Sequence, residues 1–314
     1  MKLFIGHISA LEYWRRANAP GSRISRAVPR RGVAPGRREL DAFDLALAGL
    51  GFDFSNLHVN VAGPSARRKV KGVTCHSTGL GLVPESYCEI RDGLFVATPE
   101  AALCQAAQDL SFLHLLCEAY SLCGTYSNGA HEAELLPRMK AASLQRYRLR
   151  CGGFNGSRKV DHVLKYLLDG SASKMETKLT LLLCLPQRFG GYGLPFPVLN
   201  KPIEEAMKMK APSSLRESGG LRCDLLWPEA GFALEYDSDA WHGWAEKLNA
   251  DSKRRSKLER EGLHVLSVTR TQLRDVFAFD DVARIAASAV GYRIRERSAD
   301  PISRRMELRR GLPF

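Results

Sequence analysis

The sequence lacks any apolar run as long as the roughly 18 residues that a membrane-spanning helix needs. Its first residues, MKLFIGHISALEYWRR, contain too short an apolar run, with the wrong flanking residues, for a secretory signal peptide. These two absences predict a cytoplasmic protein that has no membrane partner.

The sequence also lacks the short motifs of several large enzyme classes. It has no P-loop, GxGxxG, HExxH or GxSxG pattern, so nothing supports a nucleoside triphosphatase, a zinc protease of that type or an α/β-hydrolase. Its eight cysteines include no CxxC pair and no zinc-ligand spacing, and several lie within apolar runs such as LLLCLP. We expect them to be buried, reduced thiols, as in a cytosolic protein.

Positive charge is in clear excess. The 46 Lys and Arg outnumber the 34 Asp and Glu, which gives a formal charge of +12. Such an excess favours a polyanionic partner, most simply DNA, although a basic but otherwise unspecialised protein is the alternative. Residues 19–38, APGSRISRAVPRRGVAPGRR, are either a loop that contacts phosphates or a solvated linker.

The chain is long enough, at 314 residues, for two domains. Residues 1–150 predict an α+β module, with one hairpin joined by the basic turn PSARR, a second hairpin turning at Asp92-Gly93, and a helix opened by Pro99. The segment CGGFNGSRK predicts a hinge. Residues 155–292 then predict a second domain, and residues 293–314 a basic, flexible tail.

The most informative segment is RCDLLWPEAGFALEYDSDAWHG, residues 222–243, which predicts a β-hairpin around the turn PEAG. A four-residue loop pairs Trp227 with Phe232 and therefore places Asp224 opposite Glu235. Alternation then puts Asp224, Glu235 and Asp237 on one face, and Leu221, Cys223, Leu225, Trp227, Phe232, Leu234 and Tyr236 on the other. Facing carboxylates destabilise a sheet, so we expect a divalent cation between them, which is the role that Mg²⁺ or Mn²⁺ would fill.

Two helices flank this hairpin in the sequence. Ser173 and Glu176 form the S-x-x-E pattern of a helix-capping box; alternatively, Glu176 projects toward the hairpin as a third acid. Downstream, Asp251 and Arg255 share a helical stripe with Trp244, Leu248 and Leu258. They are either a structural ion pair or groups that face the site, with Arg255 contacting a substrate phosphate.

His242 follows the acidic strand within SDAWHG. A lone histidine is often structural, but the near-neutral pKa of an ordinary histidine would suit a general base here. The other seven histidines show no comparable neighbours in the sequence.

Taken in order, these residues resemble the PD-(D/E)XK nuclease superfamily, and more closely the branch related to very-short-patch-repair endonucleases. The resemblance covers about residues 155 to 290. It rests on a helix with Glu176, the pattern D-x10-E-x-D on a hairpin, then WH, then D-x3-R on a helix, then HVLSVT. It implies a restriction-endonuclease-like domain, with a mixed sheet in the element order αβββαβ, that binds Mg²⁺ and cleaves DNA.

The same resemblance implies individual roles. Asp224 and Glu235 would hold the metal, Glu176 would be the helix acid of this branch, and His242 would lie near the scissile phosphate. Asp237 stands where most members carry lysine, so the usual lysine role is unfilled; in this branch lysine is commonly absent.

The N-terminal half is similar, over LHVNV, VTCHS and DGLFVATPEAALCQAA, to AbiEi-type antitoxin or regulator proteins. We therefore expect an α/β chain in which a smaller α+β domain precedes a Mg²⁺-dependent DNA endonuclease that acts in repair or defence. Two alternatives stay open: a catalytically inactive DNA-binding regulator or antitoxin-like protein, and a protein-interaction module such as a toxin partner.

Overall fold

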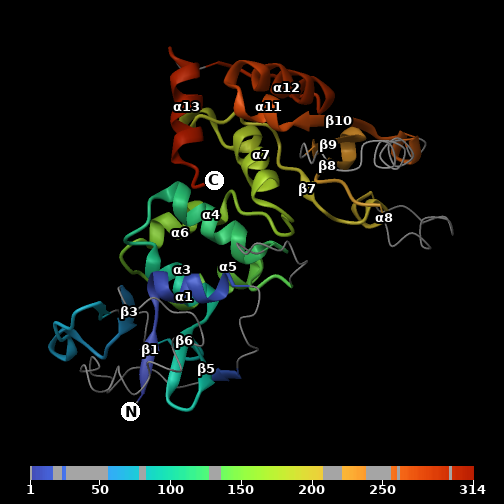
Figure 1. Ribbon diagram of the computed structural model, residues 1–314. Helices are drawn as coiled ribbons and strands as arrows, with labels where there is room; N and C mark the ends of the chain where they lie inside the picture. Colours follow the sequence, from blue (N-terminus) through green and yellow to red (C-terminus); the bar gives the residue numbers. More distant parts are fainter. Residues whose placement is uncertain are drawn as a thin grey trace. The chain divides into compact units, whose positions relative to one another are not determined.

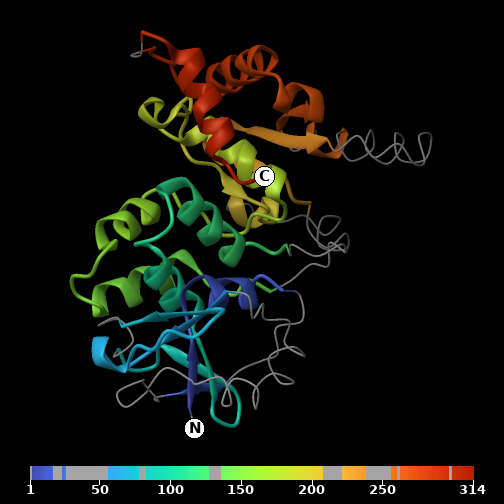
Figure 2. The same ribbon diagram turned by 60° about the vertical axis from the view of Figure 1, so that its left-hand side comes forward.

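A computed structural model describes residues 2–16, 56–77, 83–126, 136–207, 221–237, 256–259, 262–296 and 299–314, and the backbone of residues 23–25. The chain is mixed α/β and forms two compact units, Met1–Asp169 and Gly170–Phe314, called here the first and second unit (Figures 1 and 2). Among the described residues, the helices are all too short or too polar to cross a membrane. The first unit spans more of the chain than the second, so the expectation of a smaller N-terminal domain is wrong.

The first unit is built on a mixed six-stranded sheet with the strand order β2-β5-β6-β1-β3-β4. β5 and β6 form the hairpin that the sequence predicts, and Gly93 at its turn has a φ of 73°, which glycine adopts without strain. The strands are β1 Leu3–Ile5, β2 Arg23–Ser25, β3 Leu57–Asn60, β4 Val73–His76, β5 Tyr87–Arg91 and β6 Leu94–Ala97.

The predicted hairpin around PSARR is wrong. β3 and β4 pair in parallel, with Leu57 opposite Val73 and Asn60 opposite His76. The PSARR segment is therefore part of a crossover rather than a tight turn, and Pro64–Ala66 form the short 3₁₀ helix η1 within it. Both strands were correctly identified, but alternation within a strand carries no information about the direction of its partner.

Helices cover this sheet in the first unit. Thr98 and Ser111 cap the helices α3 and α4 by accepting hydrogen bonds from Ala101 N and His114 N, as short hydroxyl side chains do at N-caps. α1 packs against α3 (Figure 1). The helices are α1 His7–Trp14, α3 Pro99–Ala106, α4 Phe112–Cys123, α5 Ala141–Arg150 and α6 Ser157–Leu164.

The helix α6 belongs to the first unit, although the sequence analysis placed it in the second domain, which was expected to start at residue 155. Val160 and Val163 are fully buried, and α6 packs against α4 and α5. Arg148 and Asp161 form an ion pair of 2.9 Å that also ties α5 to α6. The glycine-rich segment CGGFNGSRK thus comprises the α5–α6 connection and the first residues of α6, and the two units divide between Asp169 and Gly170.

The second unit contains a mixed four-stranded sheet of order β10-β9-β8-β7. β10 lies at one edge of the sheet and pairs in parallel with β9. The other two pairs, β9–β8 and β8–β7, are antiparallel. The described strands follow the predicted order, and residues 256–259 are helical as expected. The elements are α7 Lys174–Cys184, η3 Gln187–Phe189, β7 Val198–Leu199, α8 Ile203–Ala206, β8 Leu225–Trp227, η4 Pro228–Ala230, β9 Phe232–Asp237, β10 His264–Thr269, α11 Arg270–Arg274, α12 Val276–Ala289 and α13 Pro301–Gly311.

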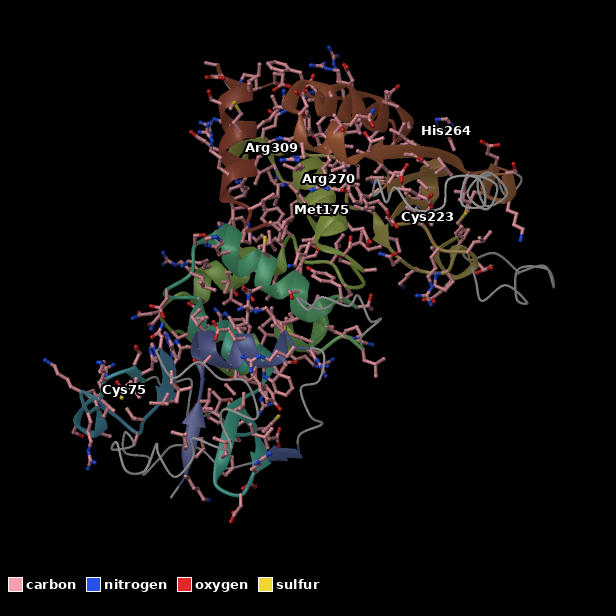
Figure 3. All side chains as sticks on the ribbon, in the orientation of Figure 1. Cys75, Met175, Cys223, His264, Arg270 and Arg309 are labelled. Carbon is pink, nitrogen blue, oxygen red and sulfur yellow. The ribbon has the colours of Figure 1, made fainter. Side chains whose placement is uncertain are left out.

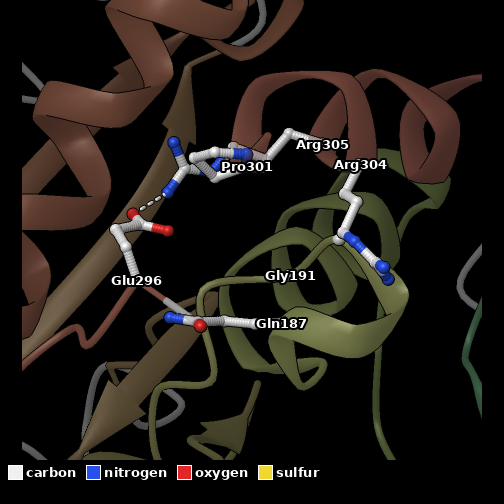
Figure 4. Close-up of a pocket in the computed structure, with 7 residues that line it drawn as sticks. Gln187, Gly191, Glu296, Pro301, Arg304 and Arg305 are labelled. Carbon is white, nitrogen blue, oxygen red and sulfur yellow. Dashed lines mark hydrogen bonds and ion pairs between the residues drawn. The ribbon is translucent and has the colours of Figure 1, made fainter. Parts of the chain in front are cut away.

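The basic C-terminal segment is a helix rather than a flexible tail. α13 packs against η3 so closely that a Cβ added to Gly190 would lie 2.1 Å from the carbonyl oxygen of Arg304. Arg305 is buried, pairs with Asp280 at 2.6 Å and lies over the ring of Tyr192. It also forms an ion pair with Glu296 (Figure 4). These contacts explain why a charged segment is ordered here.

Replacing Arg305 with alanine should lower the free energy of unfolding by about 3 kcal/mol, because the two acids lose a buried partner. The neighbouring Arg304 is exposed, so Arg304→Ala should change it by less than about 0.5 kcal/mol. Urea denaturation of both variants makes the comparison. Equal stability of the two would show that the Arg305 ion pairs contribute nothing to folding.

Candidate functional site

Glu176 lies in the first turn of α7 and is only 7% exposed. Ser173 caps this helix, and its Oγ accepts a hydrogen bond of 3.1 Å from Glu176 N. The Glu176 carboxylate does not return to Ser173 N. Its Oε2 atom accepts hydrogen bonds from Ala172 N at 2.8 Å and from Asn200 Nδ2 at 2.5 Å. Only the Ser173 half of the predicted capping box is formed. The Glu176 carboxylate is held instead by Ala172 N and by Asn200, which lies after β7.

Asn200 is a site residue that the sequence analysis missed. It follows β7 with a φ of 46°, a left-handed conformation that asparagine adopts more easily than most residues. Its backbone N–H donates to Cys223 O at 3.1 Å while its side chain donates to Glu176. One residue therefore joins the start of α7 to the segment that leads into β8.

The β8–β9 hairpin has the predicted register. Trp227 pairs with Phe232 and Leu225 with Leu234, and the next position along the ladder, beyond the paired residues, would set Asp224 opposite Glu235. β8 begins only at Leu225, so Asp224 lies just before the strand, where its Oδ2 accepts a 2.8 Å hydrogen bond from Tyr236 N. Backbone pairing thus fixes the position of this acid at the open end of the hairpin.

The two faces of the hairpin are less distinct than predicted. By alternation, Leu226 and Ala233 share the face of Asp224 and Glu235, and both are fully buried in an apolar cluster. Cys223 packs into that same cluster rather than with Leu225 and Trp227, because β8 does not extend back to it. The cluster also contains Ile203, Leu258 and Leu263, and Leu221 packs against it. The acids therefore lie at the edge of an apolar layer.

Glu176 and Asp224 lie close enough to affect each other's charge. Burial and, second, the negative charge of Asp224 raise the pKa of Glu176 from 4.5 to about 7, and the hydrogen bonds from Ala172, Asn200 and Ser173 oppose the rise. A like charge nearby favours a proton or a cation at such a carboxylate. The Glu176 carboxylate therefore lies within electrostatic range of Asp224, and its role as a third acid of the site stays a prediction.

The other predicted residues fall in three places. Glu235 is partly buried in β9 and pairs in register with Ser267 of β10. Asp237 is exposed at the end of β9, opposite Thr269. His242, Asp251 and Arg255 lie outside the described residues. The name carboxylate site is used below for Glu176, Asp224 and Glu235.

A second group of polar side chains lies in the first unit, and the sequence analysis missed it. Within the described ranges, His7, His76 and Asp109 form the one group of three or more His, Cys, Asp or Glu residues in which the ligand atoms all lie within 4.8 Å of one another. Burial and, second, neighbouring histidines lower the pKa of His7 to about 2 and that of His76 to about 4. These imidazoles are therefore neutral. A sequence signal existed, since a histidine begins α1 and others lie in β3 and β4, but its use requires knowing that these strands are neighbours in the sheet.

The comparisons with known proteins give no family for the chain: no protein-family model, curated protein or solved structure matches it.

The raised pKa of Glu176 makes stability depend on pH. The folded state holds this proton more tightly than the unfolded state, so the contribution to stability is complete below pH 4.5 and is lost as the pH rises to about 7. In metal-free buffer, Glu176→Gln should therefore be more stable relative to wild type at pH 8 than at pH 5. Thermal unfolding at both values measures this difference.

Glu205→Gln is the matched control, because Glu205 is an exposed acid of α8. It should give the same stability difference from wild type at both pH values. A pH-independent difference for Glu176→Gln as well would show that Glu176 is ionised throughout and is not strained by Asp224.

Proposed function

We propose that the second unit is a metal-dependent deoxyribonuclease whose metal site is the carboxylate site. The observation that carries this proposal is the buried Glu176 carboxylate, whose pKa is raised by burial and by the charge of Asp224. Asp224 itself is hydrogen-bonded at the open end of the β8–β9 hairpin. A protein that needed these residues only for folding would gain nothing from placing two acids together. The order of α7, the strands β7, β8 and β9, the helical residues 256–259 and β10 agrees with this proposal, as does the resemblance to PD-(D/E)XK nucleases, although the short helix α8 lies between β7 and β8.

The donor atoms suit Mg²⁺ or Mn²⁺. Carboxylate oxygens are hard ligands, and Mg²⁺ is usually bound by one or two carboxylates together with water and substrate phosphate oxygens. Asp224 and Glu235 would hold the ion, because continuing the register of the paired residues by one position would set them opposite each other. The ion would polarise the scissile phosphate and make a bound water more acidic. The three acids do not form a preassembled cluster as tight as that of His7, His76 and Asp109 in the described residues.

The protein contributes orientation and proton transfer. Tyr236 N fixes one oxygen of Asp224, and Asn200 and Ala172 N fix one oxygen of Glu176. A pKa of about 7 allows Glu176 to give or take a proton near neutral pH. His242 is the second candidate for accepting a proton from the attacking water, and Arg255 for steadying the phosphate, with Asp237 and Asp251 tuning the charge.

The competing function is that of a DNA-binding regulator or antitoxin-like protein that has lost cleavage. One observation favours it: Asp237, in the place of the superfamily lysine, is an exposed acid and adds no positive charge near a phosphate. The two functions differ in what they need from the carboxylate site. A nuclease needs the metal there for turnover, whereas a regulator needs no metal to bind DNA.

Cleavage of single- and double-stranded DNA with Mg²⁺ or Mn²⁺ tests the proposal. Asp224→Asn and Glu235→Gln should each lower the cleavage rate at least about 100-fold, because loss of a metal ligand costs more than loss of its supporting contacts. Glu229→Gln changes an exposed acid of the same hairpin loop and should keep the wild-type rate.

Calorimetric titration with Mn²⁺ separates the outcomes. Metal binding that disappears in Asp224→Asn, together with cleavage by the wild type, establishes the nuclease. DNA binding without metal binding or cleavage indicates the regulator. Equal cleavage by the wild type and both variants would show that the active site lies elsewhere.

The excess of positive charge predicts DNA binding that weakens with salt. Each phosphate contacted releases counterions, so log affinity should fall with log salt with a slope of about −0.9 per phosphate. Fluorescence anisotropy with a labelled duplex at several salt concentrations measures the slope. A flat response would favour the protein-interaction module, with a toxin or other defence protein as partner.

A further inference from the structure

We propose that His7, His76 and Asp109 form a transition-metal site in the first unit, with Zn²⁺ as the cation that fits it. The site is independent of the carboxylate site and uses a different ligand chemistry. The name histidine cluster is used below for these three residues together with His58.

The ligands come from three separate elements. His7 is the first residue of α1 and follows β1, His76 ends β4, and Asp109 lies between α3 and α4. All three ligand atoms lie within 4.8 Å of one another, and His7 Nδ1 is 3.6 Å from Asp109 Oδ2. A metal ion bound here would join the edge strand β4 to the helical layer.

The imidazole of His7 is the strongest evidence. Its side chain is 0% exposed, and both its ring nitrogens are buried without a hydrogen-bond partner. A buried polar atom without a partner costs about 1–3 kcal/mol, and such atoms are rare in native structures unless a ligand or ion satisfies them. Asp109 faces His7 from beyond hydrogen-bond distance, and a bound cation would satisfy both groups at once.

The backbone around His7 is firmly held. The residue has a φ of 50°, a left-handed conformation that is unusual outside glycine. Gln105 Oε1, in α3, accepts a 3.0 Å hydrogen bond from His7 N. A Cβ at Gly6 would lie 1.8 Å from Asn60 Nδ2, so only glycine fits before His7. These contacts fix the direction in which the imidazole leaves the chain.

His58 supports the second imidazole. His58 Nδ1 lies 2.9 Å from His76 Nε2, and the ring of His76 stacks on that of His7 with centroids 3.4 Å apart. When His76 donates its Nε2–H to His58, its Nδ1 keeps a lone pair for a metal. Metal-binding histidines usually donate their second ring N–H in this way, and that bond fixes the tautomer and the ring orientation.

The ligand set selects the class of cation. Two neutral imidazoles and one carboxylate suit Zn²⁺ and related first-row ions, whereas Mg²⁺ and Ca²⁺ prefer oxygen ligands alone. Three protein ligands leave a fourth position of tetrahedral Zn²⁺ for water. The side chain of Asp109 is 47% exposed, which gives the ion a path from solvent.

The test is a titration of the full-length, chelator-treated protein with Zn²⁺ in the presence of excess Mg²⁺. Calorimetry measures the binding, and the midpoint of thermal unfolding measures the stabilisation. We expect one Zn²⁺ per chain and a higher midpoint for the wild type. Asp109→Asn and His76→Ala should each weaken Zn²⁺ binding at least about tenfold. Asp109 is partly exposed, so its variant should fold even where a histidine variant does not.

Three control variants locate the ion. His114→Ala removes an exposed histidine of α4, and Cys75→Ser removes the thiol beside His76 (Figure 3). Asp224→Asn disables the carboxylate site. All three should keep wild-type Zn²⁺ binding, and Co²⁺ should give visible absorption bands that are lost in Asp109→Asn.

Three results would overturn the proposal. The first is the absence of Zn²⁺ binding by the wild type. The second is binding of equal strength by wild type and Asp109→Asn. The third is binding lost in any of the control variants, which would place the ion at surface residues or at the carboxylate site. Failure of the nuclease proposal would leave these expectations unchanged, because the proposed Zn²⁺ ligands include no residue of the carboxylate site.

Discussion

The second unit is organised around the cost of burying the Glu176 carboxylate. A buried carboxylate must be hydrogen-bonded or neutralised. Ala172 N and Asn200 Nδ2 supply the hydrogen bonds, and Asn200 also bonds to the backbone of Cys223, which leads into β8. One acid therefore ties the start of α7, the end of β7 and the entry to the hairpin together. The charge of Asp224 adds to the cost, and a proton on Glu176 relieves it.

The candidate sites of the two units lie at comparable positions in their sheets. In both, polar side chains gather where strands of a mostly apolar sheet begin or end: Asp224 before β8, and His76 at the end of β4. Such positions let a side chain leave the packed sheet while the backbone stays fixed by its ladder. The units differ in ligand type, because oxygen donors predominate in one and neutral imidazoles in the other. If both proposals hold, the two groups would favour different classes of cation and would not compete for one ion.

Local patterns in the sequence predicted local structure well. The PEAG turn gave the register of β8 and β9, S-x-x-E located the start of α7, and Pro99 opened a helix. What failed depends on partners far away in the chain. The strands around PSARR looked like a hairpin but pair in parallel, and the histidines seemed isolated because β1, β3 and β4 become neighbours only in the folded sheet. Arg305 looked like one more surface charge, because sequence does not reveal that Asp280 and Glu296 meet it.

The excess of positive charge supports a DNA partner only as far as the Lys and Arg side chains are available to contact phosphates. Ion pairs such as Arg148–Asp161 use one charge of each sign and leave the excess unchanged. Several cations, however, bind backbone carbonyls inside their own unit: Lys159 bonds to Ala107 O and Leu110 O, Lys178 to Phe314 O, and Arg309 to Leu273 O. These side chains stabilise the fold through their hydrogen bonds, so they are poorly placed to bind a phosphate. The charge free to meet DNA is therefore smaller than the formal +12. For this reason the geometry of Glu176 and Asp224 is stronger support for a phosphodiester substrate than the net charge.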